Sequence, residues 1–119
     1  MPYTTLQLEF PGEVATITLT RPEKRNAISS AMIADLMAAF AEAEANPARV
    51  LILTGAGDAF CSGMDLDELK AAATQSPTEH LEDSRRTARL YRRIWGFPKP
   101  TIAAVNGPAI AGGCGLATL

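Results

Sequence analysis

The stretch Val50-Leu51-Ile52-Leu53-Thr54-Gly55-Ala56-Gly57-Asp58 decides the fold class of this 119-residue chain. Its four consecutive apolar residues have the length of one strand, and a continuous apolar run is typical of a strand buried on both faces of a parallel sheet. The glycines that follow end the strand. A second run of the same kind, Thr101 to Val105, ends at Asn106-Gly107-Pro108. Two such strands, separated by helical sequence, predict an α/β fold.

Helices are expected on both sides of the first apolar run. An apolar stripe at helical spacing predicts a helix from near Ser30 that stops at Asn46-Pro47. Residues 66–73 read as a short helix. Ser76-Pro77-Thr78-Glu79 combines a cap, a proline at the first helical position and a capping-box glutamate, and so begins a helix that runs to about Trp95. The apolar side of this helix is expected to carry Leu81, Ala88, Tyr91 and Trp95.

The two ends of the chain complete the architecture. Alternating apolar and polar residues at 5–10 and 14–20, joined by Pro11-Gly12, predict an antiparallel hairpin. At the other end, glycines at 112–115 open an apolar segment that reaches Leu119 with no stop signal. We therefore expect residues 1–119 to be the N-terminal part of a single larger domain, with a parallel sheet at its core.

Composition excludes several classes of protein. The chain is 47% hydrophobic and 20% charged, which is the balance of a globular domain, and its net charge of −2 lacks the positive surface of a nucleic-acid binder. No apolar run approaches the ~18 residues of a membrane span, and no basic segment precedes an apolar one at the start. Two cysteines and one histidine offer no disulfide framework and no metal site. A cytoplasmic protein with no nucleic-acid, membrane or metal partner is expected.

Common catalytic motifs fit poorly. Gly55 and Gly57 follow a strand as in a dinucleotide fingerprint, but the third glycine position is Phe60. Cys61 also follows a strand, but no nucleophile elbow surrounds it. Cys114, among glycines, could be activated by a helix N-terminus. The alternative is that both cysteines are small buried residues.

Two glycine turns are alike, because each follows a predicted strand and opens a predicted helix. They are Phe60 to Leu66 and Gly107 to Gly115. Each can leave backbone N–H groups free at a helix start, and two such donors aimed at one point form an oxyanion hole. The alternative is that both are only loops at the carboxyl ends of parallel strands, which is still the edge where open α/β sheets bind ligands.

Three segments resemble the signature stretches of the enoyl-CoA hydratase/isomerase (crotonase) family, in the family's order and spacing. They are Val14–Ser29, Leu51–Leu66 and Phe97–Leu116. The resemblance implies a spiral of ββα units that binds acyl-CoA thioesters and assembles as trimers or hexamers. It also implies chemistry through a thioester enolate that needs no metal and no organic cofactor.

The resemblance also implies site residues. The enolate oxygen would be held by the backbone N–H groups of Met64 and Gly112. The coenzyme A moiety would lie along Lys24, Arg25, Ala27, Cys61, Ser62, Gly63, Asp65, Leu66 and Asp67. Lys24 and Arg25 could pair with phosphates, or they could be a solvated basic loop. For Asp65 a role at a helix N-terminus is preferred over catalysis.

Two positions depart from the family pattern. Family hydratases have a glutamate where this chain has Gly115, and their second glutamate would fall beyond Leu119. Glycine cannot transfer a proton, so isomerisation of an enoyl-CoA is favoured over hydration. The alternative is a truncated, non-catalytic relative that binds acyl-CoA or only assembles with partners. Ala111 replaces the first glycine of the usual triplet, which is a mild change if its φ is negative.

Overall fold

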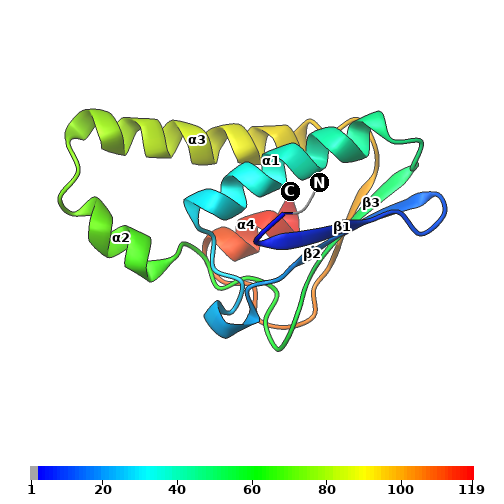
Figure 1. Cartoon of the computed structure of the whole chain (residues 1–119), viewed down its shortest axis with the longest axis horizontal. Coiled ribbons are helices and arrows are strands. Elements are labelled where there is room, and N and C mark those ends of the chain that lie inside the picture. The colour runs from blue at the N-terminus through cyan, green and yellow to red at the C-terminus, as the bar shows by residue number, and fades with distance from the viewer. Residues whose placement is uncertain (1–2) are drawn as a thin grey trace.

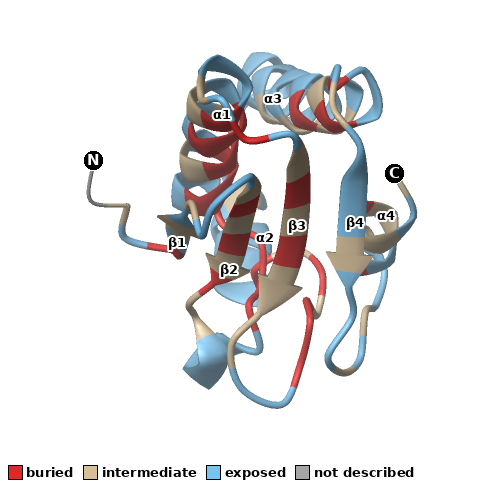
Figure 2. Ribbon diagram, turned by 90° about the vertical axis from the view of Figure 1, so that its right-hand side faces the viewer, coloured by how far each residue is buried: buried red, intermediate tan, exposed pale blue. Residues whose placement is uncertain are grey.

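A four-stranded mixed sheet is the centre of the fold in the computed structural model, which describes residues 3–119 (Figures 1 and 2). The strands lie in the order β1-β2-β3-β4, with β1 and β2 antiparallel and the other two pairs parallel. The expected hairpin and parallel crossovers are therefore confirmed. The elements are β1 (Leu6–Glu9), β2 (Val14–Leu19), the 3-10 helix η1 (Pro22–Lys24), α1 (Ser30–Ala45), β3 (Val50–Gly55), α2 (Leu66–Ala72), α3 (Pro77–Trp95), β4 (Thr101–Ala104) and α4 (Gly112–Thr118).

The parallel arrangement brings three loops to one edge of the sheet. Because β2, β3 and β4 run in the same direction, their carboxyl ends at Leu19, Gly55 and Ala104 share that edge. The arrowheads in Figure 2 point towards it, and the loops that leave from it lie below the sheet in Figure 1. This edge is where an open α/β sheet binds ligands.

The core lies between the sheet and the helices α1 and α3. Alternate residues of β2 and β3 are buried against these helices, whereas Val50 and Ile52 on the other face of β3 are only half-buried. The expectation that β3 is buried on both faces is therefore wrong for its outer face. Helix α1 supplies six buried residues, and its N-cap Ser29 accepts a hydrogen bond from the N–H of Met32. This first turn sets where the helix leaves the sheet edge.

Helix α3 packs with a different face from the one expected. Its buried residues are Leu90 and Ile94, whereas Leu81 and Trp95 are exposed. The capping box at Ser76 is confirmed. Only the C-terminal part of α3 contributes buried residues, and its N-terminal part forms an arm with α2 at the left of Figure 1. The apolar pattern in the sequence does not distinguish these two parts of the helix, so it predicted the wrong buried face.

Strand β4 is exposed, contrary to the expectation of a buried strand. Ile102 is 52% exposed and Val105, which follows the strand, is 51% exposed. Within residues 3–119, β4 pairs with β3 alone and is an edge strand of the sheet.

Between residues 3 and 119, no helix combines the length and apolar character needed to cross a bilayer.

Candidate active site

Two isolated bridges connect the three loops at the carboxyl edge of the sheet. Ile28 bridges Met64, and Cys61 bridges Ala109, both in parallel fashion. The N–H of Ile110 donates to the carbonyl of Cys61 at 3.0 Å. Residues 61–64, which follow β3, therefore lie between the loop after β2 and the loop after β4. The loops are extensions of the sheet, and their backbone is fixed by it.

Two asparagine side chains hold the loop that follows β3. Asn26 is fully buried, and its amide donates to the carbonyls of Ala56 and Ala59 while its oxygen accepts from the N–H of Arg21. Asn106 donates to the carbonyls of Gly57 and Ala59. Sequence analysis did not single out either asparagine for this role. Asparagine in a polar loop is too common to show that its amide will be buried.

The bridge to Ile28 does not use the N–H of Met64. Ile28 donates to the carbonyl of Gly63 at 2.7 Å and accepts from the N–H of Asp65 at 2.9 Å. In a parallel bridge these two bonds belong to the neighbours of the bridged residue, so the N–H of Met64 points away from Ile28. Gly112 is the first residue of α4, where a backbone N–H has no intrahelical acceptor.

These two donors lie on adjacent turns of the backbone. A methyl group on Gly63 would lie 3.7 Å from the nitrogen of Gly112, and one on Gly112 would lie 3.9 Å from the Cα of Gly63. Gly63 also has φ of +100°, a conformation that side chains strongly disfavour. Glycines thus allow the two turns to touch. Two neighbouring N–H donors of this kind can hold an oxygen that becomes negatively charged during a reaction.

Ala111 differs from the sequence expectation. Its φ is +52° and its ψ is −117°, a region that glycine occupies readily and alanine does not. The expected negative φ, and with it the mild view of the missing glycine, is therefore wrong. Across this turn, the N–H of Gly113 donates to the carbonyl of Ile110 at 2.8 Å. A methyl group on Gly113 would lie 2.1 Å from the carbonyl oxygen of Cys61, so α4 begins in direct contact with the loop after β3.

Most of the predicted ligand-binding residues line one hollow, here called the loop hollow, of about 450 Å³. Those that line it are Lys24, Arg25, Ala27, Ser62, Met64, Asp65, Leu66 and Asp67. Cys61 and Gly63 are not among them. The side chain of Cys61 is buried in the core. Gly112 also lies outside this lining, on the turn that touches Gly63. The predicted residues from the first two signature segments are thus brought together.

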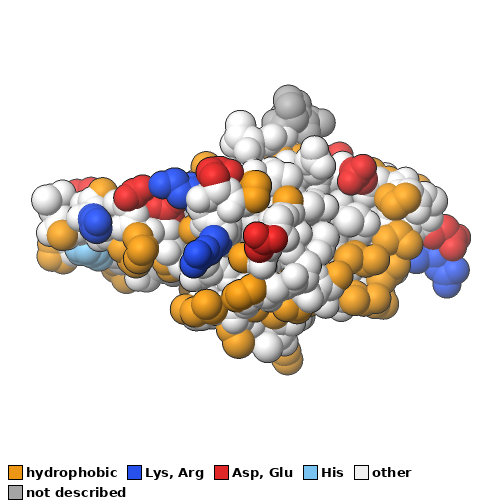
Figure 3. All heavy atoms as spheres, turned by 90° about the horizontal axis from the view of Figure 1, so that it is seen from below, with side chains coloured by type: hydrophobic (Ala, Val, Ile, Leu, Met, Phe, Trp, Pro, Cys, Tyr) orange, Lys and Arg blue, Asp and Glu red, His pale blue; other side chains and the backbone are white. Residues whose placement is uncertain are grey.

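A second hollow, the helix hollow of about 470 Å³, opens between α1, α2 and α3. Met64 and Asp65 line both hollows, so the two hollows meet at these residues. Apolar Ile33 and Leu69 line the helix hollow beside polar His80 and Thr87. Figure 3 shows this mixture on the arm made by α2 and α3, where the single histidine is pale blue.

Asp65 is a buried carboxylate with a structural role. It caps α2 by accepting from the N–H groups of Asp67 and Glu68, and it forms an ion pair with Arg21 at 2.9 Å. The Arg21 guanidinium beside it lowers the pKa of the Asp65 carboxyl. The preferred role at a helix N-terminus is confirmed. Because Asp65 directly follows Met64, the cap and the ion pair fix the peptide that precedes α2.

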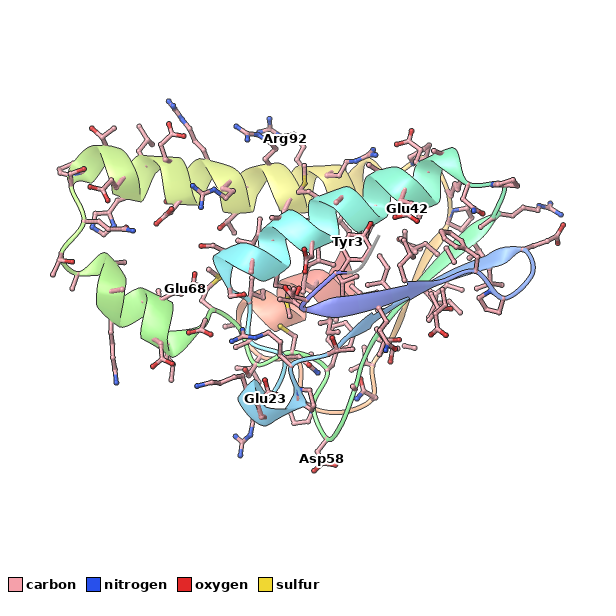
Figure 4. The ribbon with its side chains drawn as sticks, viewed as in Figure 1. Tyr3, Glu23, Glu42, Asp58, Glu68 and Arg92 are labelled. Atoms are coloured by element: carbon pink, nitrogen blue, oxygen red, sulfur yellow. The ribbon has the colours of Figure 1, made fainter. Side chains whose placement is uncertain are left out.

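Glu68, in the first turn of the same short helix, connects it to α1. Its carboxylate accepts from the N–H and the hydroxyl of Ser30, both at 2.9 Å. Figure 4 shows Glu68 reaching from α2 towards the start of α1. This contact closes one side of the helix hollow, and nothing in the local sequence indicated it.

Tyr91 is a site residue that sequence analysis missed. Its hydroxyl donates to the carbonyl of Gly112 at 2.8 Å, from helix α3 to the first residue of α4. Burial raises the pKa of the Tyr91 phenol. The sequence placed Tyr91 on an apolar face but held no signal for its hydrogen-bond partner, which is 21 residues away.

The two cysteines differ in their burial. Cys61 is buried, as expected of a small core residue, and burial raises the pKa of its thiol. Cys114 is exposed, so the expectation of a buried residue is wrong there. Across residues 3–119, no three histidine, cysteine or acidic side chains are grouped so that they could hold a metal ion.

Comparison with known proteins identifies the family. The family model described as enoyl-CoA hydratase/isomerase matches residues 9–119. A Thermus thermophilus protein named as a candidate enoyl-CoA hydratase is 45% identical over 107 residues, which cover 89% of this chain and 42% of that protein. The enoyl-CoA hydratase EchA19 of Mycobacterium tuberculosis is 42% identical over 110 residues, which cover 89% of this chain and 40% of that protein.

The fold agrees with these matches. The crystal structure of an enoyl-CoA hydratase/isomerase from Xanthobacter autotrophicus Py2 superposes with a TM-score of 0.92 at 40% identity, over 97% of this chain and 43% of that chain. The chain thus spans less than half the length of the relatives that it matches. The resemblance seen in the three signature segments and the expected crotonase-like α/β fold are confirmed: this chain belongs to the enoyl-CoA hydratase/isomerase family.

Proposed function

We propose that this chain provides the enolate-stabilising half of an acyl-CoA enzyme. The observation that carries the proposal is that the N–H groups of Met64 and Gly112 lie on touching turns and have no acceptor within residues 3–119. A base that removes a proton beside a thioester leaves negative charge on the thioester oxygen. Two preorganised backbone donors stabilise that charge without reorganising at the moment of reaction.

The two hollows suggest how a thioester would lie. Coenzyme A is an anionic phosphate compound, and the loop hollow presents Lys24, Arg25 and Lys70. Lys24 forms an exposed ion pair with Asp67 at 3.3 Å, a contact that a phosphate could replace. The acyl group would then pass Met64 into the helix hollow, because Met64 lines both.

Isomerisation of an enoyl-CoA is the reaction that we favour over hydration. Hydration needs two acid–base groups around a water molecule, and position 115 supplies none. The surroundings of Gly115 support this choice, because a methyl group there would lie 3.3 Å from Cε2 of Tyr91. A side chain at position 115 would thus begin in tight contact with the tyrosine ring. Isomerisation requires only that one group removes a proton from one carbon and returns it to another.

Several wider properties belong to the same proposal. Residues 1–119 would form the N-terminal part of a single crotonase-like domain, and the acid–base residue would come from outside them. The assembled protein would be a cytoplasmic homo-oligomer, a trimer or hexamer, acting without a metal or organic cofactor. These features rest on family membership rather than on contacts in this chain.

Replacing one amide by an ester tests the donors individually. An α-hydroxy acid incorporated at position 64 or 112 removes the N–H and adds no atoms, which matters because a methyl group on Gly112 would lie 2.9 Å from Tyr91 Oη. In the complete gene product, each ester is expected to lower the kcat for isomerising a 3-enoyl-CoA by roughly 10²–10³-fold. The same replacement at Ala31, in the exposed first turn of α1, is the matched control.

The outcome is read from two assays on the same proteins. Isomerisation is followed by the ultraviolet absorbance of the conjugated product, and hydration of crotonyl-CoA by the loss of that absorbance. Full activity with esters at both 64 and 112 would disprove the oxyanion hole. Hydration as fast as isomerisation in the unaltered protein would disprove the preference based on Gly115.

A further inference from the structure

The ring of Tyr91 lies across the first turn of α4. Its hydroxyl donates to the carbonyl of Gly112 at 2.8 Å. A methyl group on Gly112 would lie 2.9 Å from that hydroxyl oxygen, and one on Gly115 would lie 3.3 Å from the ring edge. Two glycines one helical turn apart therefore make room for one aromatic side chain, and α3 is fastened to α4 at this point.

This contact supports a strained turn that must stay in place. The N–H of Gly112 belongs to the peptide that follows Ala111, and Ala111 has φ of +52°. A residue in this region relaxes unless its neighbours fix it. On one side, the N–H of Gly113 donates to the carbonyl of Ile110 at 2.8 Å. On the other side, the phenol of Tyr91 donates to the carbonyl of Gly112.

We propose that Tyr91 is a positioning residue that aims the N–H of Gly112 at the thioester oxygen. This inference rests on the proposed function, because it assumes that Gly112 is an oxyanion donor. Tyr91 lines neither the loop hollow nor the helix hollow, so it acts through the backbone of Gly112 and not by touching the acyl group. Burial raises the pKa of the phenol, so it remains a hydrogen-bond donor throughout the neutral range.

The test compares two tyrosines that each lose only a hydroxyl. Tyr91→Phe keeps the ring against Gly115 and removes the donor. Tyr3→Phe is the matched control, because Tyr3 Oη donates to Glu42 Oε1 at 2.6 Å, away from both hollows (Figure 4). The probe is a 2,4-dienoyl-CoA, whose ultraviolet band moves to longer wavelength when donors polarise its thioester carbonyl. The complete gene product is used, and kcat and KM are measured separately.

Tyr91→Phe is expected to lose most of the red shift and to lower kcat by about three- to tenfold, the worth of one hydrogen bond, with KM little changed. Tyr3→Phe is expected to keep both values. Tyr91→3-fluorotyrosine keeps a hydroxyl donor and is expected to show the full red shift. This variant therefore separates an effect on the orientation of the Gly112 N–H from an effect on the stability of the fold.

Three results would overturn the inference. A full red shift in Tyr91→Phe would show that the hydroxyl does not aim the donor. If Tyr91→Phe and Tyr3→Phe lose red shift and kcat equally, in proportion to their lost stability, Tyr91 has only a structural role. No red shift in the unaltered protein would refute the proposed function itself, and the role of Tyr91 with it.

Discussion

Replacing Ala111 by glycine is expected to stabilise this protein, although the same change destabilises most sites. Ala111 has φ of +52° and ψ of −117°, and its side chain is exposed. The methyl group therefore contributes little buried surface, and the surrounding contacts hold the backbone in a conformation that alanine disfavours. Glycine would keep the turn and remove the conflict.

The magnitude follows from two opposing contributions. A non-glycine residue in such a region costs about 1–3 kcal/mol in the folded state. Glycine also gives the unfolded chain more freedom, which costs about 0.4–1 kcal/mol. The difference favours Ala111→Gly by about 1 kcal/mol, which raises the melting temperature by a few degrees, on the order of 4 °C.

Urea unfolding measures this difference directly. The matched control is Ala73→Gly at the end of α2, because Ala73 is also exposed but has φ of −60°. Ala73→Gly is expected to lower the free energy of unfolding by about 0.5–1 kcal/mol. If Ala111→Gly lowers stability as much as Ala73→Gly does, Ala111 is not strained and the account of this turn fails.

Three further changes test the framework around the site. Asn26→Ala removes the three hydrogen bonds made by a buried amide and is expected to cost about 2–4 kcal/mol in urea unfolding. Gly113→Ala places a methyl group 2.1 Å from the carbonyl oxygen of Cys61, and a loss of about 3 kcal/mol or more is expected in the same assay. Arg21 lowers the pKa of Asp65, so their pairing contributes stability above the unfolded pKa of about 3.9, and this is lost as pH falls through the folded pKa. Unfolding titrations from about pH 7 to pH 3 should show that loss in the unaltered protein and a flatter profile in Asp65→Asn.

The backbone geometry of the candidate site could be anticipated only in part. The glycine turns at 60–66 and 107–115 were visible in the sequence, because glycine clusters after a strand have few structural explanations. That the turns touch depends on the bridge between Cys61 and Ala109, which joins residues 48 positions apart. The roles of Asn26 and Tyr91 depend in the same way on partners brought close by folding.

The local elements and the family could be predicted from the amino-acid sequence. Hairpin, caps and helix ends are fixed by interactions within a few residues, as the capping box at Ser76 shows, and the signature segments are read directly. Tertiary structure alone decided which faces are buried and which residues are strained. Helix α3 buries Leu90 and Ile94 near its C-terminal end, where Arg93 forms an ion pair with Glu44 of α1. Ala111 holds a positive φ because contacts at Gly113 and Tyr91 outweigh its own preference. Local preference is worth only about 1 kcal/mol per residue, which a few long-range contacts exceed.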